Sequence, residues 1–387
     1  MIKLCLLGFG TVGQGVFRIL QENKTLSERF AVSSILVRDT NKVREVHADP
    51  ALLTDDKKEV FSDPAIDCFV ELTGEVDGIK DDIVHALQNG KHVVTANKAL
   101  ISAALEELEE AADKGGASLR YEAAVAGAVP VVKAVTDLSR VHPANEIQGI
   151  LNGTCNFILS RMEAGESYET ALKEAQQLGF AEADPSADVD GYDTQRKLRI
   201  LATLGFGASV TEEDIPCRGI AELEAADLAI LKKYGRKVKL MGIAKRKDRR
   251  FTAQVCPVCV PHEDAFSQVD GSYNRVQIEA DYPGTLSWTG PGAGMLPTAH
   301  AVWNDILDAF AHAPVSAPPR TSLVNANETA VNTYYLRAKK PVEKLFPDIP
   351  RRSLGDARIV GPVRADTWAE ICSRLEEPRW ALWIDEE

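Results

Sequence analysis

The chain has 387 residues, 45% of them hydrophobic and 26% charged, and its formal net charge at neutral pH is −13. The length predicts two or three globular domains. The acidic balance argues against nucleic acid as a partner, because phosphate binding needs a basic surface. No apolar run is long enough to span a membrane, and the seven cysteines without an export signal indicate reduced thiols. We therefore expect a cytoplasmic protein that acts on a small molecule, with no nucleic-acid or membrane partner.

Residues 1–131 alternate between short apolar runs and helical patterns. Such alternation predicts an α/β fold, a parallel sheet covered by helices on both faces. The helical patterns include Ile83–Asn89 and Ala103–Lys114. The apolar runs are Ile2–Leu7, Val32–Val37, Cys68–Leu72, His92–Thr95 and Leu119–Glu122.

A glycine motif, Gly8-Phe9-Gly10-Thr11-Val12-Gly13, directly follows the first apolar run and opens a helical pattern. The first glycine allows a tight turn, the second lets a pyrophosphate approach the backbone, and the third lets helix and strand pack closely. The helix N-terminus supplies N–H donors to the phosphates. The motif is weak alone, but at the first strand of an alternating domain it predicts a Rossmann-type dinucleotide-binding domain. The alternative is a glycine turn in another α/β protein.

The end of the second apolar run bears on the choice between NADP(H) and NAD(H). A cationic residue there accommodates a 2′-phosphate, whereas an acidic one accepts a hydrogen bond from the ribose hydroxyl. Arg38 comes first and Asp39 follows it, so we expect NADP(H) to be preferred with NAD(H) still possible. In the alternative, Arg38 pairs with Asp39 or stays solvated.

A lysine, Lys98, lies just beyond the carboxyl end of the apolar run His92–Thr95. Ligands bind at that edge of open parallel sheets. A lysine in this position is otherwise a solvated charge, and position alone does not separate the two.

Residues 132–297 have the texture of an α+β domain. A helical stretch begins near Asn156, a second covers Asp193–Phe206, and strand-like runs follow at Lys237–Ala244, Phe251–Val260 and Arg275–Ala280. Apolar residues spaced three and four apart then predict an amphipathic helix at about 298–312 that packs back on the first domain. The Pro-rich stretch 313–319 suggests a linker, and residues 333–387 carry strand, helix and strand patterns.

An acidic loop over residues 181–191 precedes Asp193 and Lys197, which share one helix face at i and i+4. For an arbitrary protein the better interpretation is a solvated loop with a surface ion pair. The functional interpretation is more specific: hydride delivery to an aldehyde builds negative charge on oxygen, which an ammonium can stabilise and protonate. A lysine is ordinarily protonated at neutral pH, so the reverse oxidation should favour higher pH. Glu182, Asp188 and Asp193 could hold a substrate ammonium or orient Lys197.

Three further patterns are weaker. The turn Gly290–Gly294 either only reverses the chain or admits a ligand close to the backbone. Cys256 and Cys259 with His262 form one CxxC pair without a second, so a zinc site is disfavoured. The basic cluster Lys245–Arg250 is most simply a solvated hairpin turn.

Taken together, these motifs resemble homoserine dehydrogenase over residues 1 to about 310. The resemblance implies the interconversion of aspartate 4-semialdehyde and homoserine with NADPH or NADH, on the route to threonine, methionine and isoleucine. The segments that carry it are GFGTVGQGV, VVTANKAL, YEAAVAGAVPVV, GILNGTCNFILSRM, LGFAEADPSADVDGYDTQRKL and GPGAGMLPTA.

The resemblance also implies roles for individual residues. Lys197 looks like the catalytic proton donor and Lys98 like a second lysine near substrate and nicotinamide. The residues expected to bind substrate are Glu182, Asp193, Asp188, Thr154 and Gly153, with Asn152 in the same loop beside the nicotinamide. Those expected to bind the cofactor are Gly8, Phe9, Gly10, Thr11, Val12, Gly13, Arg38, Thr73, Lys98 and Gly294. Those that look like ligands of a structural sodium or potassium ion, mostly through backbone carbonyls, are Glu122, Val125, Gly127 and Val129.

The end of the chain departs from the family pattern. Many members end in a regulatory ACT domain that begins near a YYLR segment. Tyr334–Arg337 matches that segment, but Ala338-Lys339-Lys340-Pro341 replaces the acidic, glycine-bearing start. We expect residues 333–387 to form a short, degenerate ACT-like segment that binds an effector poorly or not at all.

The predicted protein is thus an NADP(H)-preferring homoserine dehydrogenase, a homodimer through the sheet of its second domain by resemblance to the family. One alternative is a dehydrogenase of another small amino-acid aldehyde or amine on the same scaffold. A second is a non-catalytic, NADP-binding regulatory protein. The presence of Lys98, Glu182, Asp193 and Lys197 argues against the second, because a protein without turnover has no need of them.

Overall fold

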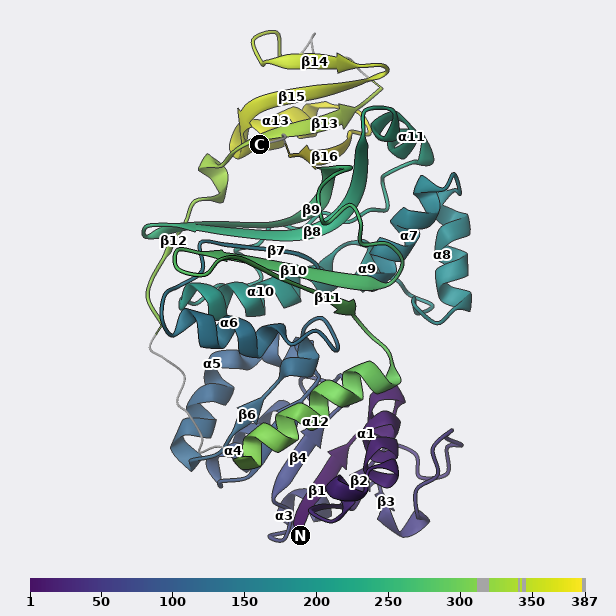
Figure 1. Ribbon diagram of the computed structural model, residues 1–387, viewed down its shortest axis with the longest axis vertical. Helices are drawn as coiled ribbons and strands as arrows, with labels where there is room; N and C mark the ends of the chain where they lie inside the picture. Colours follow the sequence, from purple (N-terminus) through teal and green to yellow (C-terminus); the bar gives the residue numbers. More distant parts are fainter. Residues whose placement is uncertain (312–319, 340–341, 343–345, 385–387) are drawn as a thin grey trace. The chain divides into compact units, whose positions relative to one another are not determined.

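The computed structural model describes residues 1–311, 320–339, 342 and 346–384 (Figure 1). The chain divides into two compact units. Unit 1 comprises Met1–Asp137 and the described residues from Pro291 to Ala311, and unit 2 comprises Leu138–Gly290 and the described residues from Arg320 onward. The predicted linker at 313–319 lies outside the described residues. Within the described ranges, no helix is long and apolar enough to cross a membrane.

Unit 1 is built on a parallel sheet with the strand order β3-β2-β1-β4-β5-β6. Leu4 of β1 pairs with Val32 of β2 on one side and with Cys68 of β4 on the other. This is the strand order of a doubly wound dinucleotide-binding sheet, in which the chain adds strands first on one side of β1 and then on the other. The predicted α/β class is therefore confirmed. The strands are β1 (Ile2–Leu7), β2 (Phe30–Leu36), β3 (Leu53–Thr54), β4 (Cys68–Glu71), β5 (His92–Thr95) and β6 (Leu119–Arg120).

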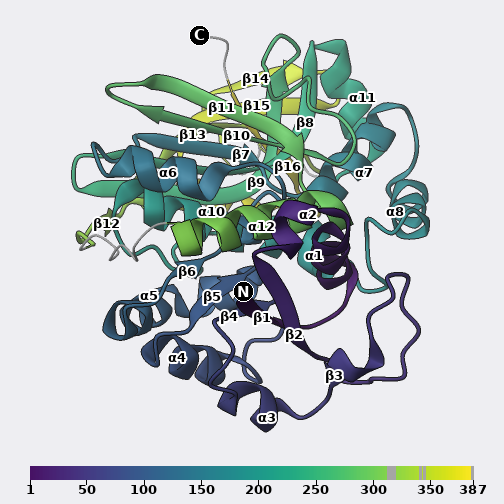
Figure 2. The same cartoon turned by 60° about the horizontal axis from the view of Figure 1, so that its bottom comes forward.

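Helices cover both faces of this sheet, as the alternating pattern predicts. In Figure 2, α1 and α12 lie on one side of the sheet and α4 and α5 pack side by side on the other. The helices are α1 (Thr11–Glu22), α2 (Lys24–Ser27), α3 (Lys57–Ser62), α4 (Lys80–Gln88), α5 (Lys98–Gly115), α6 (Val131–Ser139) and α12 (Met295–Ala311), with 3-10 turns at Pro50–Leu52 and Glu122–Ala124.

The predicted return helix is α12, and it packs beside α1 (Figure 1). The indole of Trp303 is buried, donates to the Val16 carbonyl at 2.9 Å and meets the ring of Phe30 edge to face at 5.6 Å. A Cβ on Gly15 would lie 2.7 Å from the Met295 carbonyl oxygen. The small glycine therefore lets the two helices approach closely.

A buried carboxylate on α12 gives a prediction about stability. Asp305 accepts a 2.7 Å hydrogen bond from the Glu122 N–H, and burial, followed by the nearby Glu122 charge, raises its pKa well above the ordinary range. A carboxyl with a raised pKa lowers the free energy of unfolding at high pH, because ionisation is easier in the unfolded chain. This loss grows as the pH rises from the unfolded-state pKa to the folded-state pKa. Asp305→Asn keeps an acceptor oxygen without charge. We expect it to raise the melting temperature at pH 8, by roughly 2–4 °C per kcal/mol gained, and by less at pH 5. Thermal unfolding across this range tests it, and destabilisation that grows with pH would contradict it.

Unit 2 is built on a larger mixed sheet with the order β11-β10-β7-β8-β9-β16-β13-β15-β14, and β12 pairs with β9. Neighbouring strands are antiparallel in most pairs, while β16 runs parallel to β9. The α+β prediction for this part is confirmed. The strands are β7 (Glu146–Ile150), β8 (Arg236–Lys247), β9 (Arg250–Pro261), β10 (Tyr273–Ala280), β11 (Gly284–Pro291), β12 (Val324–Asn325), β13 (Val331–Arg337), β14 (Arg351–Leu354), β15 (Ala357–Arg364) and β16 (Arg379–Trp383).

Three helices, α7, α10 and α11, pack on β8 of this sheet. The helices of unit 2 are α7 (Gly153–Glu163), α8 (Tyr168–Gln177), α9 (Ser186–Val189), α10 (Tyr192–Phe206), α11 (Ala225–Lys233) and α13 (Ala365–Arg374), with a 3-10 turn at Asn327–Thr329.

The basic cluster Lys245–Arg250 lies in the hairpin between β8 and β9, as predicted, but most of it is strand. Lys247 pairs with Arg250, so the turn itself is only two residues long. Cys256 and Cys259 are buried free thiols on β9. They lie three positions apart, so their side chains leave opposite faces of the strand.

The chain end continues the same sheet. Across the sheet its strands lie in the order β16, β13, β15, β14, which are the fourth, first, third and second strands of the chain end. Helix α13 connects β15 to β16. The predicted YYLR segment lies on β13. The Tyr335 hydroxyl donates to buried Asp227 at 2.8 Å, and Arg337 donates to Asp227 at 2.5 Å and to Glu224 at 2.7 Å. These bonds attach the chain end to the N-terminus of α11.

Candidate functional site

The glycine motif occupies the turn from β1 into α1. Gly8 has a φ of +103°, and a Cβ there would lie 2.9 Å from the Leu72 carbonyl oxygen. A Cβ on Gly13 would lie 2.5 Å from the Gly8 carbonyl oxygen. A Cβ on Gly10, in contrast, would have no heavy atom within 4 Å. Gly8 and Gly13 are therefore required by the fold, whereas Gly10 leaves open space at the helix N-terminus.

That N-terminus can receive an anion. Gly10 is the N-cap of α1 and provides no side-chain cap, so the first N–H groups lack a side-chain acceptor and suit a phosphate. The Phe9 side chain is buried against Phe17, with ring centroids 5.6 Å apart, and Val12 packs against the same core. Phe9 can therefore contact a cofactor only through its backbone.

Arg38 lies just after β2 with its side chain 85% exposed, and it forms an ion pair with Glu75. The sequence suggested Asp39 as the alternative partner. Asp39 instead accepts from the Asn41 N–H at 2.8 Å, and its carbonyl accepts from Arg44 at 2.8 Å.

A buried carboxylate organises the carboxyl ends of β4 and β5. Glu71 is fully buried and accepts three hydrogen bonds: from the Thr73 N–H at 2.8 Å, from the Thr73 hydroxyl at 2.6 Å and from the Thr95 hydroxyl at 2.6 Å. Thr73 was among the residues expected to bind the cofactor, whereas Glu71 was not. The available signal was an acidic residue ending an otherwise apolar strand.

Lys98 is the first residue of α5, at the predicted sheet edge. Asn97 caps this helix by accepting from the Leu100 N–H at 3.1 Å. The Asn97 N–H donates to the Thr95 hydroxyl at 2.9 Å, and its side chain donates to the Glu75 carbonyl at 2.6 Å. The backbone just before Lys98 is therefore fixed by hydrogen bonds to Thr95 and to Glu75, the residue that pairs with Arg38.

The loop predicted to hold a cation adjoins the late glycine turn. Ala126 and Gly127 both have positive φ, 56° and 60°, and a Cβ on Gly127 would lie 2.6 Å from the Gly292 backbone. Gly294, with a φ of +120°, directly precedes α12. These contacts place the turn that carries Gly294 against Gly127 within unit 1.

Glu122, the one acidic residue among the predicted cation ligands, already has partners. Its Oε1 accepts from the Val132 N–H at 2.8 Å and its Oε2 from the Lys133 N–H at 2.9 Å. Burial raises the pKa of this carboxyl despite those bonds. In the described part of the chain no three His, Cys, Asp or Glu side chains cluster as a metal site. A cation here would therefore be held by the carbonyls of Glu122, Val125, Gly127 and Val129.

In unit 2, Lys197 and Asp193 lie one turn apart on α10 and both are buried. The Lys197 ammonium donates to Asp193 Oδ2 at 2.7 Å and to the Leu151 carbonyl at 2.7 Å. The alternative of a surface ion pair is wrong, because the Lys197 side chain is only 11% exposed and the Asp193 side chain 6%.

The loop at the start of α7 lies against this pair. Asn152 donates to Asp188 Oδ1 at 2.6 Å and to Asp193 Oδ2 at 2.9 Å. A Cβ on Gly153 would lie 2.6 Å from the Ser272 carbonyl oxygen, so only glycine fits. The Thr154 hydroxyl donates to the Phe180 carbonyl at 2.7 Å, which ties the loop to the start of the acidic segment.

The structure brings together Asn152, Asp188, Asp193 and Lys197. Glu182 is exposed on the acidic loop, and its carbonyl accepts from Gln176 at 3.0 Å. Among the described residues, its carboxylate makes no hydrogen bond to the other predicted substrate ligands. The sequence named Asn152 only as part of a loop, although an Asn directly before a helix is a recognisable capping signal.

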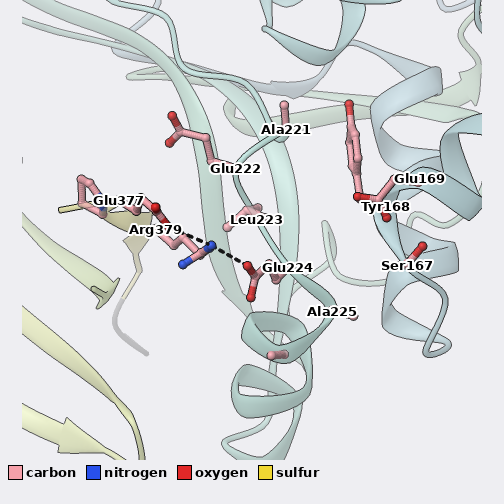
Figure 3. Close-up of a pocket in the computed structure, with 12 residues that line it drawn as sticks. Ser167, Tyr168, Glu169, Ala221, Glu222, Leu223, Glu224, Ala225, Glu377 and Arg379 are labelled. Atoms are coloured by element: carbon pink, nitrogen blue, oxygen red, sulfur yellow. Dashed lines mark ion pairs between the residues drawn. The ribbon is translucent and has the colours of Figure 1, made fainter. Parts of the chain in front are cut away.

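A separate hollow of about 620 Å³ lies between α8, the segment leading into α11, and the chain end (Figure 3). Its lining includes Tyr168, Glu222, Glu224 and Arg379, with Arg379 paired to Glu224. It contains none of the predicted site residues. Arg379, the one cationic residue of its described lining, also lies 3.7 Å from Glu377, while Glu222 pairs with Arg218 outside the lining.

The described residues offer one candidate site in each unit: an anion-accepting helix terminus in unit 1, and a buried ammonium beside carboxylates in unit 2. The first suits a dinucleotide, and the second suits protonation of an oxygen that gains negative charge.

Comparisons with known proteins agree with this chemistry. The family model described as homoserine dehydrogenase matches residues 130–307, and the one described as its NAD binding domain matches residues 8–122. The homoserine dehydrogenase of Bacillus subtilis is 39% identical over 312 residues, which cover 79% of this chain and 72% of that protein.

Solved structures agree as well. A homoserine dehydrogenase from Thiobacillus denitrificans is 31% identical with a TM-score of 0.88, over 99% of this chain and 98% of that one. A hyperthermophilic archaeal homoserine dehydrogenase in complex with NADPH is 25% identical with a TM-score of 0.68, over 81% of this chain and 99% of that one. These relatives decide against the two alternatives that the sequence left open. The chain belongs to the homoserine dehydrogenase family of NAD(P)-dependent oxidoreductases, which interconvert aspartate 4-semialdehyde and homoserine in amino-acid biosynthesis.

Proposed function

We propose that Lys197 is the proton donor when this enzyme reduces aspartate 4-semialdehyde, with NADPH as the preferred cofactor. The observation that carries the proposal is the Lys197 ammonium, buried and held by Asp193 at 2.7 Å and by the Leu151 carbonyl at 2.7 Å. A fixed ammonium in a buried site stabilises charge on an oxygen far better than one in water, because little reorganisation is needed. Replacing Lys197 with methionine and measuring kcat in both directions of the reaction tests this role.

The other predicted residues have supporting roles in this proposal. Asp193 holds the lysine and, with Glu182, accepts the substrate ammonium, while Asp188 supports both. Gly153 and Thr154 shape the loop beside the substrate, and Lys98 acts as a second cation near the reacting carbonyl. When bound, the reduced nicotinamide supplies the hydride. Homoserine oxidation needs the neutral form of Lys197, so its rate should rise with pH.

The domain roles follow the same division. We assign cofactor binding to residues 1–131 with the return helix at about 298–312, and substrate binding to residues 132–297. Open space at Gly10, the uncapped α1 terminus and Thr73 at the sheet edge support the first assignment. The buried cluster around Lys197 supports the second.

Arg38 is expected to set the preference for NADPH. Arg38→Ala should lower kcat/KM for NADPH by about tenfold or more, since a charge-assisted contact to phosphate is lost, and should leave NADH nearly unchanged. Glu75→Gln is the matched variant. It removes the carboxylate that pairs with Arg38 and should shift the preference further toward NADPH. Steady-state kinetics with both cofactors measure this, and an unchanged preference in Arg38→Ala would remove Arg38 from the site.

We also propose a sodium or potassium ion in the loop of Glu122, Val125, Gly127 and Val129. The two consecutive positive-φ residues support it, because they turn the backbone sharply there, and hard oxygen donors suit such an ion. Both Glu122 oxygens accept backbone N–H groups, so carbonyls would supply the ligands. The ion would hold the loop in shape and take no part in the chemistry.

A cytoplasmic homodimer through the sheet of unit 2 is the proposed assembly. A hollow of about 1290 Å³ lies along the sheet, lined by residues of β7, β8, β9 and β10 and by the chain end, among them Gln148, Ile243, Gln254 and Gln277. A broad concave sheet surface with mixed polarity is consistent with an isologous contact.

For the chain end we propose a degenerate ACT-like segment over residues 333–387. The strand order fourth, first, third, second with a helix before the last strand supports it, since split βαβ folds share this arrangement. The attachment of Tyr335 and Arg337 to Asp227 would keep the segment in place without an effector.

A further inference from the structure

The side chain of Asn152 lies between two carboxylates and uses all of its hydrogen-bonding groups. One amide N–H reaches Asp188 Oδ1 at 2.6 Å and the other reaches Asp193 Oδ2 at 2.9 Å. The amide oxygen accepts from the Cys155 N–H at 2.8 Å and so caps α7. The residue is 4% exposed. One amide thus joins the start of α7 to α9 and α10.

The same Asp193 oxygen also accepts from the Lys197 ammonium. Asp193 Oδ2 therefore lies between two donors, the Asn152 amide at 2.9 Å and Lys197 Nζ at 2.7 Å. With the Leu151 carbonyl accepting from Nζ at 2.7 Å, the ammonium is held on both sides by groups adjacent to Asn152 or bonded to it. Any shift of Asn152 would move the acceptor that aims the lysine.

The amide also donates to two acids that lie side by side. Adjacent carboxylates repel each other and tend to share a proton, and a neutral donor bonded to each reduces that tendency. The amide nitrogen carries two N–H donors, so it can serve both acids at once.

We propose that Asn152 is a positioning residue that fixes the charge and direction of the Asp193–Lys197 pair. This inference rests on the proposed role of Lys197. Asn152 acts through Asp193 and need not touch the substrate. Its effect should therefore appear in kcat and in the pH dependence, more than in KM.

The competing explanation is that Asn152 only caps α7. Serine and aspartate cap helices about as well as asparagine, so Asn152→Ser and Asn152→Asp keep the cap. Asn152→Ser removes both donors to the acids, and Asn152→Asp also adds a third carboxylate. Ser167→Ala is the matched control. It removes a cap of the same kind from α8, and Ser167 lines the separate hollow, which contains none of the predicted site residues.

We expect Asn152→Ser to lower kcat by about tenfold or more, since small misplacements of a reacting group cost rates of that order, while KM for homoserine changes less. The pH at which homoserine oxidation is half-maximal should rise, because Asp193 then holds the ammonium more strongly. Asn152→Asp should lower kcat further. Ser167→Ala should change only the melting temperature.

Three outcomes separate the possible failures. If Lys197→Met loses activity while Asn152→Ser keeps wild-type kcat and pH profile, the role of Asn152 is wrong and that of Lys197 stands. If Lys197→Met stays active, the proposed function itself fails. Wild-type kinetics together with a nearly unchanged melting temperature in Asn152→Ser, which keeps the cap, would identify Asn152 as a cap and nothing more.

Discussion

Lys197→Met is expected to lower kcat for aspartate semialdehyde reduction by about 10³-fold, because it removes both the proton donor and the charge that stabilises the developing alkoxide. Methionine keeps an unbranched stem of similar length, so the buried space stays filled. The loss should appear in both directions of the reaction, measured by nicotinamide absorbance.

Lys239→Met is the matched control for this experiment. Lys239 is also buried in unit 2, 1% exposed, and its ammonium is bonded to the Val269 carbonyl at 2.6 Å and to Asp270 at 3.1 Å. Burial lowers the pKa of this lysine. Its replacement should cost stability and leave most of kcat. A Lys197→Met enzyme with kcat within tenfold of the wild type would exclude Lys197 as the proton donor.

The second large effect is expected at Gly10. Gly10→Val should raise the dissociation constant for NADPH by more than about tenfold, because its side chain would fill the space through which a pyrophosphate reaches the helix N-terminus. The fold should be unaffected. Gly10 has a φ of −79°, which other residues adopt freely, and no heavy atom lies within 4 Å of its Cβ position.

Gly13→Ala provides the contrast. Its Cβ would lie 2.5 Å from the Gly8 carbonyl oxygen, so it should lower the melting temperature as well as cofactor affinity. NADPH fluorescence titration and thermal unfolding distinguish the two variants. Unchanged NADPH affinity in Gly10→Val would mean that the phosphates bind elsewhere.

Local patterns in the sequence were sufficient for most of unit 1. The apolar runs and the glycine motif predicted β1, β2, β4, β5 and β6 close to their observed bounds, because buried parallel strands are continuous apolar runs. The return helix α12 followed from spacing alone. The two-residue strand β3 was missed, since two residues carry no periodicity.

In unit 2 the sequence located helices and long strands but not all of the sheet. The mixed polar and apolar residues of β7, β11 and β14 gave no clear alternation. The partners of β7 also lie far along the chain, whereas β11 pairs with the preceding strand β10 and β14 with the following strand β15. The chain end was predicted as strand, helix and strand. Its continuation of the β8–β9 sheet through the parallel pair β9–β16 could not be read from local pattern.

For the site, the helical period alone placed Asp193 beside Lys197, because residues four apart share a helix face. Whether that pair is a solvated surface bridge or a buried ammonium depended on what packs around α10. Asn152 reaches Asp188 across 36 positions and Glu71 reaches Thr95 across 24. Hydrogen bonds between segments so far apart arise only after strands and helices have packed, because nothing in local propensity specifies which distant side chain will face a buried polar group.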